Sequence, residues 1–271
     1  MKPFVKFLTI LGPIIIFIFG TICIIGTGGG GGGSSDSETP QSIETFSIES
    51  DEVEYSISVG LPPTYDDSGT PHAAIFILDG NWFFSDLFLS YDEDDDYILI
   101  GINNSYRRDI DYLPVNTCET EGGGNTSFLD FLVNELVPYL DSEYNIDPSL
   151  RLLFGHSHGG SFVFYTLFAD HGETFPFLFA NDASVRCWGV LSLEQNYFDQ
   201  DLDLPAIFYS SGATEGGADD VRPVMEKIIG REYVGLKVKY DEIQGTHDGI
   251  LNEAFSRGFD WIGSQLPDPS D

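Results

Sequence analysis

One serine stands in a setting that is typical of a catalytic nucleophile. Ser157 lies in Gly155-His-Ser-His-Gly159, and Gly-x-Ser-x-Gly is the pattern of a nucleophile on a tight strand-to-helix turn. Because such a turn brings neighbouring backbone close to the serine, we expect side chains at Gly155 and Gly159 to clash with it. A chain with 30 glycines contains this pentapeptide by chance fairly often, so its context decides whether Ser157 is catalytic.

The segments on either side of Ser157 favour a catalytic turn. The apolar stretch Leu152–Phe154 precedes it and predicts a buried strand, and the apolar stretch Ser161–Asp170 follows it and predicts a helix. This order of strand, turn and helix exposes a serine hydroxyl at the top of a sheet.

A serine nucleophile needs a base that accepts its proton and an acid that orients the base. In α/β-hydrolases the acid and then the histidine follow the serine along the chain, which here predicts Ser157, Glu215 and His247. His247 lies between the last predicted strand and the last helix, the usual place of the base, and Glu215 follows a predicted strand. A Ser–His dyad without an acid is one alternative. The rival carboxylates are Asp182, Asp219 and Asp220.

The oxyanion of an acyl-transfer reaction needs backbone N–H donors near the serine. The residue after the nucleophile, His158, supplies one of them in this arrangement, and the loop after the strand Ala73–Leu78 supplies the other. We expect the second donor to be the amide of Asn81 in Asp79-Gly-Asn81, although this tripeptide is also typical of a plain β-turn.

The rest of the chain alternates between strands and helices. Predicted strands are Ile43–Glu49, Val53–Val59, Ala73–Leu78, Tyr97–Ile102, Leu152–Phe154, Phe177–Ala180, Ala206–Ser210 and Gly235–Ile243. Predicted helices are Phe83–Ser90, Ser127–Tyr144 with a kink or early end at Pro138, Ser161–Asp170, Asp219–Ile229 and Ile250–Leu266. This order predicts an α/β fold with an N-terminal β-hairpin, a mainly parallel central sheet and helices on both faces. Functional residues are then expected at the carboxyl ends of the strands.

Bulk composition limits the classes of function. The chain has 271 residues, 42% of them hydrophobic, and a formal net charge of −32. One full-sized domain fits this length, and we place it at residues 42–267. So acidic a chain lacks the basic face that binds a phosphate backbone, which argues against nucleic acid and disfavours polyanionic substrates. The acidic surface also suits solubility or salt tolerance.

The N-terminus has the pattern of a targeting segment. Residues 1–25 carry two lysines and then a long apolar run, as in a signal peptide or a membrane anchor, and residues 26–41 form a linker rich in Gly and Ser. Cys23 near the end of the run suggests a lipoprotein, although Ile22 before it is larger than lipoprotein signals prefer. We therefore expect export to the periplasm or cell surface, with a membrane tether through the N-terminus.

Two further cysteines lie in the part that we expect to be exported. An oxidising compartment favours a disulfide between Cys118 and Cys187, with two unrelated thiols as the alternative. The sequence has no CxxC or His/Cys cluster, so we predict neither a metal nor a cofactor.

Taken together, these motifs resemble those of the putative esterase family of α/β-hydrolases, which includes esterase D, enterochelin-type siderophore esterases and some feruloyl esterases. The residues that carry the resemblance are Ile77-Leu-Asp-Gly-Asn81, Arg107-Arg108 with Tyr112 and Pro114, Phe128–Leu132 with Glu135-Leu-x-Pro138, Arg151–Gly160, Gly212–Glu215 and His247. The resemblance spans most of residues 43–266. It implies an α/β-hydrolase fold and hydrolysis of carboxyl esters through an acyl-enzyme, with Ser157 as nucleophile, His247 as base and Glu215 as acid.

The chain departs from this family in Ala183-Ser-Val-Arg-Cys-Trp188, where many relatives have Ser-Pro-Ser and tryptophans. This region is expected to line the substrate pocket, so the family's substrates do not transfer directly. Arginines are scarce here and are candidates for binding an acidic or phenolic acyl group, with solvated surface arginines as the alternative. The candidate substrate-binding residues are Trp82, Arg107, Arg108 and Trp188, with Arg186 as a further cation.

The sequence thus predicts an exported serine esterase that acts on a small-molecule ester, neutral rather than polyanionic. A non-catalytic surface lipoprotein with the same fold is the alternative from another class, and a peptidase or acyltransferase is an alternative within the fold. The sequence gives no indication of the oligomeric state.

Overall fold

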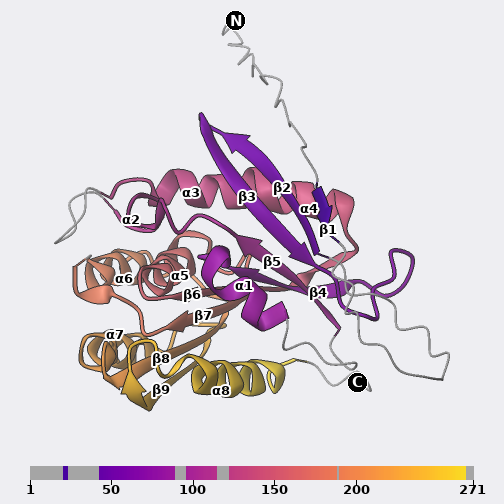
Figure 1. Cartoon of the computed structure of the whole chain (residues 1–271). Helices are drawn as coiled ribbons and strands as arrows, with labels where there is room; N and C mark the ends of the chain where they lie inside the picture. The colour runs from indigo at the N-terminus through magenta and orange to yellow at the C-terminus, as the bar shows by residue number, and fades with distance from the viewer. Residues whose placement is uncertain (1–20, 24–42, 89–95, 115–121, 188, 267–271) are drawn as a thin grey trace, which may run out of the picture.

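A computed structural model of the chain describes residues 21–23, 43–88, 96–114, 122–187 and 189–266. These residues form one twisted sheet with the strand order β1-β2-β3-β5-β4-β6-β7-β8-β9, covered by helices on both faces (Figure 1). The predicted α/β-hydrolase architecture is confirmed.

The first part of the sheet is antiparallel. β2 (Ile43–Ser50) and β3 (Val53–Gly60) form the predicted hairpin, and β1 (Thr21–Cys23) pairs with β2 at the edge. The two turn residues, Asp51 and Glu52, both have positive φ values of 47° and 65°. This is the conformation of the two-residue turns whose twist matches that of paired strands.

The remaining strands pair parallel to one another, apart from the antiparallel contact between β3 and β5. Several are buried along most of their length, as expected of strands covered on both faces. Because they run in one direction, their carboxyl ends meet at one edge of the sheet. The strands are β4 (His72–Ile77), β5 (Tyr97–Ile102), β6 (Ile146–His156), β7 (Phe177–Asn181), β8 (Ile207–Glu215) and β9 (Lys237–Thr246).

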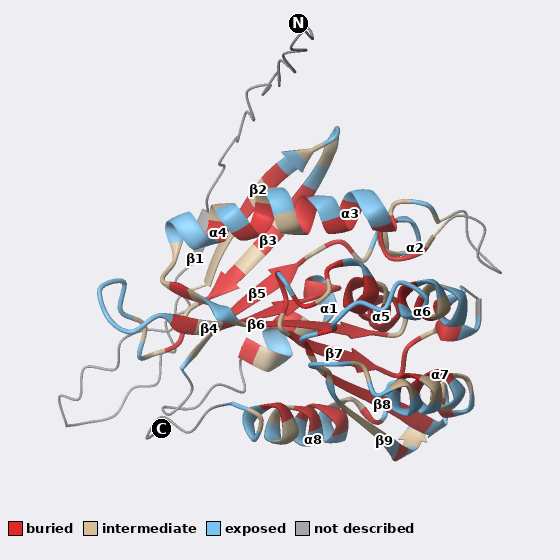
Figure 2. Ribbon diagram, turned by 180° about the vertical axis from the view of Figure 1, so that it is seen from behind, coloured by how far each residue is buried: buried red, intermediate tan, exposed pale blue. Residues whose placement is uncertain are grey.

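Helices cover the two faces unequally. One hydrophobic core joins a face of the sheet to α1 and α8, and a larger one joins the other face to the remaining long helices. Figure 2 shows the buried strands between these layers and the exposed outer sides of the helices. The helices are α1 (Gly80–Phe88), α2 (Arg108–Asp111), α3 (Asn125–Phe131), α4 (Val137–Glu143), α5 (His158–Ala169), α6 (Val190–Phe198), α7 (Ala218–Arg231) and α8 (Leu251–Gly263), with a 3₁₀ turn η2 (Val185–Cys187).

The helix predicted at Ser127–Tyr144 is divided rather than simply kinked. A π-helical segment, η1 (Leu132–Leu136), lies between α3 and α4. Pro138 is the second residue of α4, and proline has no N–H to donate to the carbonyl four residues earlier. A π-helical turn is one way in which a helix accommodates such an interruption. The predicted early end at Pro138 is wrong, because α4 continues from Val137 to Glu143, and the change in helix type lies just before this proline.

Some predictions fall outside the described residues. Most of the targeting segment and the linker are among them, and so is the role of Trp188. The predicted Cys118–Cys187 disulfide also lies outside, because Cys118 and the side chain of Cys187 are not described. In the described part of the chain, no helix has the length and apolar character needed to span a bilayer.

Candidate active site

The backbone at Ser157 has the strained geometry of a nucleophile turn. β6 ends at His156 and α5 begins at His158, so Ser157 alone makes the connection, with φ 59° and ψ −118°. Its N–H donates to the carbonyl of Asn181 at 3.0 Å, and its own carbonyl accepts the N–H of Ser184 at 3.0 Å. Strain of this kind costs of order 1–3 kcal/mol and is held by the surrounding structure. Asn181 is the last residue of β7 and Ser184 lies in the segment that follows it, so the two hydrogen bonds fix the serine at the carboxyl edge of the sheet.

Gly155 is the glycine that the turn requires. A Cβ at this position would lie 2.3 Å from the carbonyl carbon and oxygen of Gly159. At Gly159 itself a Cβ would meet Leu78 at 3.4 Å, an ordinary contact, so the predicted clash is confirmed for Gly155 and wrong for Gly159. The next residue, Gly160, is packed more tightly, because its Cβ would lie 3.0 Å from that of Ala183.

His247 follows β9 and is oriented by a buried carboxylate. Its Nδ1 lies 2.5 Å from Oδ2 of Asp182, whose side chain is fully buried. The carboxylate also accepts the N–H groups of Ala213 at 2.7 Å and Gly217 at 3.0 Å. With Nδ1 bonded to the carboxylate, Nε2 is left as the basic nitrogen. The bond to Asp182 outweighs partial burial and raises the pKa of His247 above the ordinary 6.5.

The structure does not place Glu215 as predicted. β8 continues past Ser210, so Glu215 is its last residue, exposed and in register with Thr246. The following Gly216 passes so close to Asp182 that a Cβ there would lie 2.8 Å from its Oδ2. The partner of the His247 imidazole is therefore Asp182, one of the rival carboxylates, and the expected pairing with Glu215 is wrong.

The other two rival carboxylates have arginine partners. Asp219 lies 2.9 Å from Arg222, and Asp220 lies 3.2 Å from Arg186. A signal for Asp182 was present in the sequence, because it follows the predicted strand Phe177–Ala180 almost directly. It was masked by the expectation that the acid follows the next strand.

The Ser157 hydroxyl points towards the end of β7. Its Oγ lies 3.2 Å from Oγ of Ser184, and no hydrogen bond to His247 is recorded among the described residues. Catalytic hydrogen bonds are often long or misaligned without substrate and tighten when it binds. Ser184 was not predicted as part of the site.

His156 supports the face of His247. The centroids of the two imidazole rings lie 4.4 Å apart, and the angle between the ring planes is 35°. Nδ1 of the buried His156 accepts from the amide of Asn181 at 2.9 Å, so Nε2 carries the proton and faces Asp248 at 3.3 Å. Burial, with a smaller contribution from His247, lowers the pKa of His156 to about 4. His156 is therefore a neutral ring at neutral pH.

This group also offers the one set of three metal-ligating side chains found in the described part of the chain: His156, His247 and Asp248. Nδ1 of His156 accepts from Asn181, and Nδ1 of His247 is bonded to Asp182, so each imidazole is already held by a protein partner. The two rings pack against each other with a tilt of 35°.

The loop after β4 is held by buried polar contacts. Asp79 is fully buried with φ 53°. Its carboxylate accepts from Arg108 Nε at 3.2 Å and from the Tyr112 hydroxyl at 3.2 Å, while its own N–H donates to the same hydroxyl at 3.0 Å. Burial raises the pKa of Asp79, an effect that Arg108 opposes. These contacts fix the backbone just before Asn81.

Both predicted oxyanion donors lie in first helical turns. Asn81 is the second residue of α1 and His158 is the first residue of α5. Backbone N–H groups in a first turn have no partner within the helix and attract negative charge. The Asn81 side chain is engaged with Ser105 at 2.5 Å, which leaves its backbone amide as the candidate donor.

Of the predicted substrate-binding residues, Trp82 is the most open. It is 52% exposed, and the guanidinium of Arg108 lies 5.0 Å from its ring centroid. Arg108 is largely buried on Asp79 and is therefore a structural cation of the loop. Arg107 pairs with the buried Asp111 and lines a cavity of about 420 Å³ beside β3, together with Glu52 and Tyr106.

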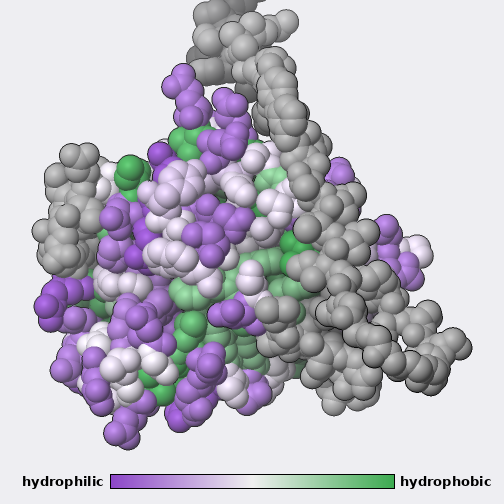
Figure 3. Space-filling view, in the orientation of Figure 1, coloured by the Kyte–Doolittle hydropathy of each residue, from purple (hydrophilic) through white to green (hydrophobic). Residues whose placement is uncertain are grey.

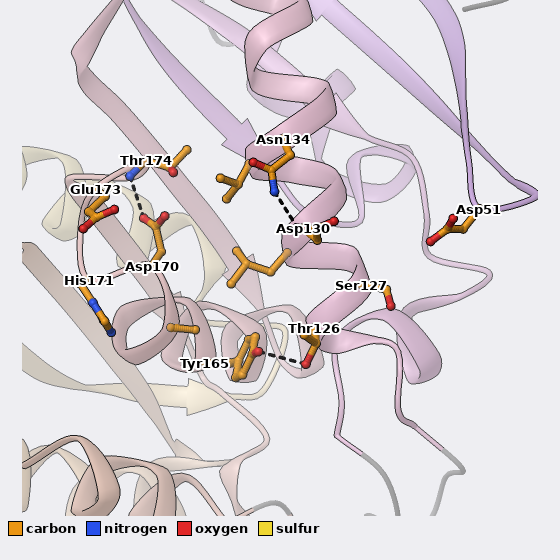
Figure 4. A pocket seen from close by; sticks show the side chains of 13 residues that line it. Asp51, Thr126, Ser127, Asp130, Asn134, Tyr165, Asp170, His171, Glu173 and Thr174 are labelled. Atoms are coloured by element: carbon orange, nitrogen blue, oxygen red, sulfur yellow. Dashed lines mark hydrogen bonds between the residues drawn. The ribbon is translucent and has the colours of Figure 1, made fainter. Parts of the chain in front are cut away.

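Two other cavities lie away from this site. One of about 670 Å³ separates α3 and η1 from the end of α5 (Figure 4). It is lined by acidic groups such as Asp130 and Glu173, and none of the predicted site residues borders it. The other, of about 310 Å³, is apolar and lies between α8 and the early parts of β4 and β6, on the face where Figure 3 shows hydrophobic side chains gathered at the centre.

Solved structures share this architecture. The chain is similar to the BES protein from Bacillus cereus, with 22% identity, a TM-score of 0.72, and coverage of 88% of this chain and 99% of that one. It is similar to the siderophore hydrolase EstA from Aspergillus nidulans, with 17% identity, a TM-score of 0.72, and coverage of 83% of this chain and 95% of that one. It is also similar to the IroE-like serine hydrolase from Shewanella oneidensis, with 21% identity, a TM-score of 0.71, and coverage of 83% of this chain and 82% of that one.

At these identities the structural likeness shows the fold. No curated protein sequence matches the chain. The model of the family described as "Putative esterase" matches residues 49–190, more than half of the sequence, and includes the turn at Ser157. The chain belongs to the putative esterase family.

Proposed function

We propose that the protein is a carboxylesterase in which Ser157, His247 and Asp182 form the catalytic triad. The observation that carries the proposal is the 2.5 Å bond from His247 to the buried Asp182, at the same edge of the sheet as the strained turn of Ser157. A buried carboxylate that selects the tautomer of a histidine beside a nucleophile turn is the arrangement that acyl transfer requires.

The chemistry follows from these positions. Ser157 Oγ attacks the ester carbonyl carbon while Nε2 of His247 takes the hydroxyl proton, and Asp182 stabilises the imidazolium that forms. The N–H groups of His158 and Asn81 bind the oxyanion. The tetrahedral intermediate then expels the alcohol, which receives the proton from His247, and leaves an acyl group on Ser157.

The second half-reaction repeats these roles with water. His247 removes a proton from a water molecule, which attacks the acyl-enzyme carbonyl and forms a second oxyanion in the same place. Collapse of this intermediate returns the proton to Ser157 and releases the carboxylic acid. No other reactant is needed.

Hydrolysis of short-chain p-nitrophenyl esters and labelling with a fluorophosphonate test the proposal together. We expect the wild-type protein to turn over the esters and to take up one probe molecule, and Ser157→Ala to do neither. Glu143→Gln is the matched control, because Glu143 is exposed and ends α4, just before the amino end of β6. A folded wild-type protein that neither reacts with the probe nor hydrolyses any ester would instead indicate a non-catalytic binding protein.

We also propose that the protein is exported and tethered through its N-terminus. The support is the pattern of residues 1–25, with Cys23 near the end of the apolar run. Fatty-acid labelling of cells that express the full chain, compared with Cys23→Ser, tests the lipid. Activity that stays in the cytosol when the cells are fractionated would contradict export.

A further inference from the structure

Exposed carboxylates flank the proposed nucleophile and base on two sides. Asp248 follows His247 directly, its side chain is 92% exposed, and it lies 3.3 Å from His156. Asp109 is 56% exposed and lies 3.0 Å from His158, on the side of the oxyanion donors. Glu215, in register with Thr246 just before His247, is exposed as well.

The histidines that contact these carboxylates do not neutralise them. Burial lowers the pKa of both His156 and His158, so each remains an uncharged ring at neutral pH. Neither ring therefore offsets the charge of the carboxylate beside it.

No guanidinium is left over to offset these charges. Each arginine of the chain lies within ion-pair distance of a carboxylate, including Arg108 beside the site and the most exposed one, Arg186. The pairs are Arg107–Asp111, Arg108–Asp79, Arg151–Asp141, Arg186–Asp220, Arg222 with Asp219 and Glu242, Arg231–Glu194 and Arg257–Glu253.

The described lysines do not supply the missing charge either. Lys227 and Lys239 pair with Glu194 and Asp241. Lys237 is the first residue of β9, at the amino end of the strand and away from the carboxyl edge. Among the described residues, the charged groups beside Ser157 and His247 that have no opposite charge next to them are therefore the carboxylates Asp109 and Asp248.

The aromatic surface at the site also suits a cation. Half of Trp82 is exposed, and the Arg108 guanidinium that lies 5.0 Å from its ring centroid is paired with Asp79. Aromatic faces attract ammonium and guanidinium groups through the ring quadrupole. Trp82 lies next to Asn81, so a group bound on it sits beside the proposed oxyanion donors.

We propose that this site selects esters that carry a positive charge, such as an alkylammonium group, over neutral esters of the same shape and over anionic ones. This inference rests on the esterase function proposed above. It differs from what a triscatecholate siderophore would need, because such a ligand is strongly anionic and finds no unpaired arginine here.

A matched pair of esters tests the selection. Butyrylcholine and 3,3-dimethylbutyl butyrate have the same shape and differ in one positive charge. At low ionic strength we expect kcat/KM to be about 10-fold higher for the cation, and the ratio to fall towards about 2 in roughly 0.5 M salt as screening increases. For a slowly hydrolysed ester, the inhibition constant against p-nitrophenyl butyrate gives the same ratio.

Single charge removals locate the source of the selection. Asp248→Asn and Asp109→Asn should each lower the ratio about 2- to 3-fold, as expected for one screened charge at short range. Glu143→Gln removes an equal charge just before the amino end of β6 and should leave the ratio unchanged. Because each ratio is taken within one variant, a general loss of rate cancels.

The outcomes separate this inference from the function on which it rests. A ratio of one or less at low salt, with p-nitrophenyl butyrate still hydrolysed, overturns the charge selection and leaves the esterase intact. Equal effects of the three substitutions on the ratio also overturn the proposed selection, because the preference would then come from the net charge of the whole protein and not from the carboxylates at the site. Failure of every ester and of fluorophosphonate labelling overturns the esterase itself.

Discussion

The bond between His247 and Asp182 makes a prediction for single substitutions. Asp182→Asn allows the wrong imidazole tautomer, so we expect kcat/KM for p-nitrophenyl butyrate to fall about 10³- to 10⁴-fold. Glu215→Gln is the matched control, because Glu215 is exposed, and its effect should stay within about 2-fold. A larger loss with Glu215→Gln than with Asp182→Asn would show that the acid is misassigned.

The same bond sets the pH dependence. Asp182 raises the pKa of His247 in the free protein above 6.5. Protonated His247 cannot accept the serine proton, so kcat/KM should fall as the pH is lowered through this raised pKa. Removing the carboxylate charge in Asp182→Asn should move the acid limb to lower pH. A pH–rate profile of both proteins measures the shift, and an unmoved or raised limb in the variant would contradict the pairing.

His156 is a positioning residue, and the stacking it provides can be isolated. His156→Ala removes the ring under His247 and should lower kcat about 10- to 100-fold with little change in KM. His156→Phe keeps a flat ring and should recover part of this loss. Because His156 is neutral, neither change should move the acid limb of the pH profile. Equal losses in the two variants would argue against stacking.

At the scale of elements, the approach of β6 to α5 depends on one glycine. Gly155→Ala forces a Cβ onto the carbonyl of Gly159 at 2.3 Å, and we expect it to lower the free energy of unfolding by about 3 kcal/mol and to abolish activity. Gly159→Ala meets only an ordinary contact and should change stability by less than about 1 kcal/mol. Urea unfolding of both variants tests the difference, and similar losses would show that the turn relaxes.

Elements were predicted best where the pattern is local. The hairpin, the parallel strands and the long amphipathic helices follow from hydrophobic periodicity, and Ser157 and His247 follow from their places between such elements. The helix Val190–Phe198 was missed, and so was the π-helical segment Leu132–Leu136. The latter depends on how hydrogen bonds rearrange before Pro138, which periodicity does not show.

The acid illustrates what the sequence leaves out. Choosing Asp182 over Glu215 requires knowing that β8 runs on to residue 215 and that Gly216 and Gly217 pack over the end of β7. Strand ends are set by pairing with β9 rather than by local propensity. Because so acidic a chain offers many candidate carboxylates, their order along the sequence was the only guide to which one is the acid.

In the whole molecule, the proposed catalytic residues and exposed carboxylates lie at the same edge of the sheet. The parallel strands β6, β7 and β9 lie in one sheet (Figure 1), and Ser157, Asp182 and His247 each follow the carboxyl end of one of them. The chain carries a formal net charge of −32, and Asp109 and Asp248 place two of its carboxylates beside the histidines that adjoin Ser157 and His247. In the esterase function that we propose, these charges bear on which esters reach Ser157.

The most direct test of the account is to trap the acyl-enzyme. The protein is mixed with p-nitrophenyl butyrate, quenched in acid within the first turnover, and analysed by intact-mass and peptide mass spectrometry. We predict one butyryl group per chain on the peptide that contains Ser157, a matching burst of p-nitrophenol, and no acylation of Ser157→Ala. A butyryl group on another residue, or turnover that persists in Ser157→Ala, would contradict it.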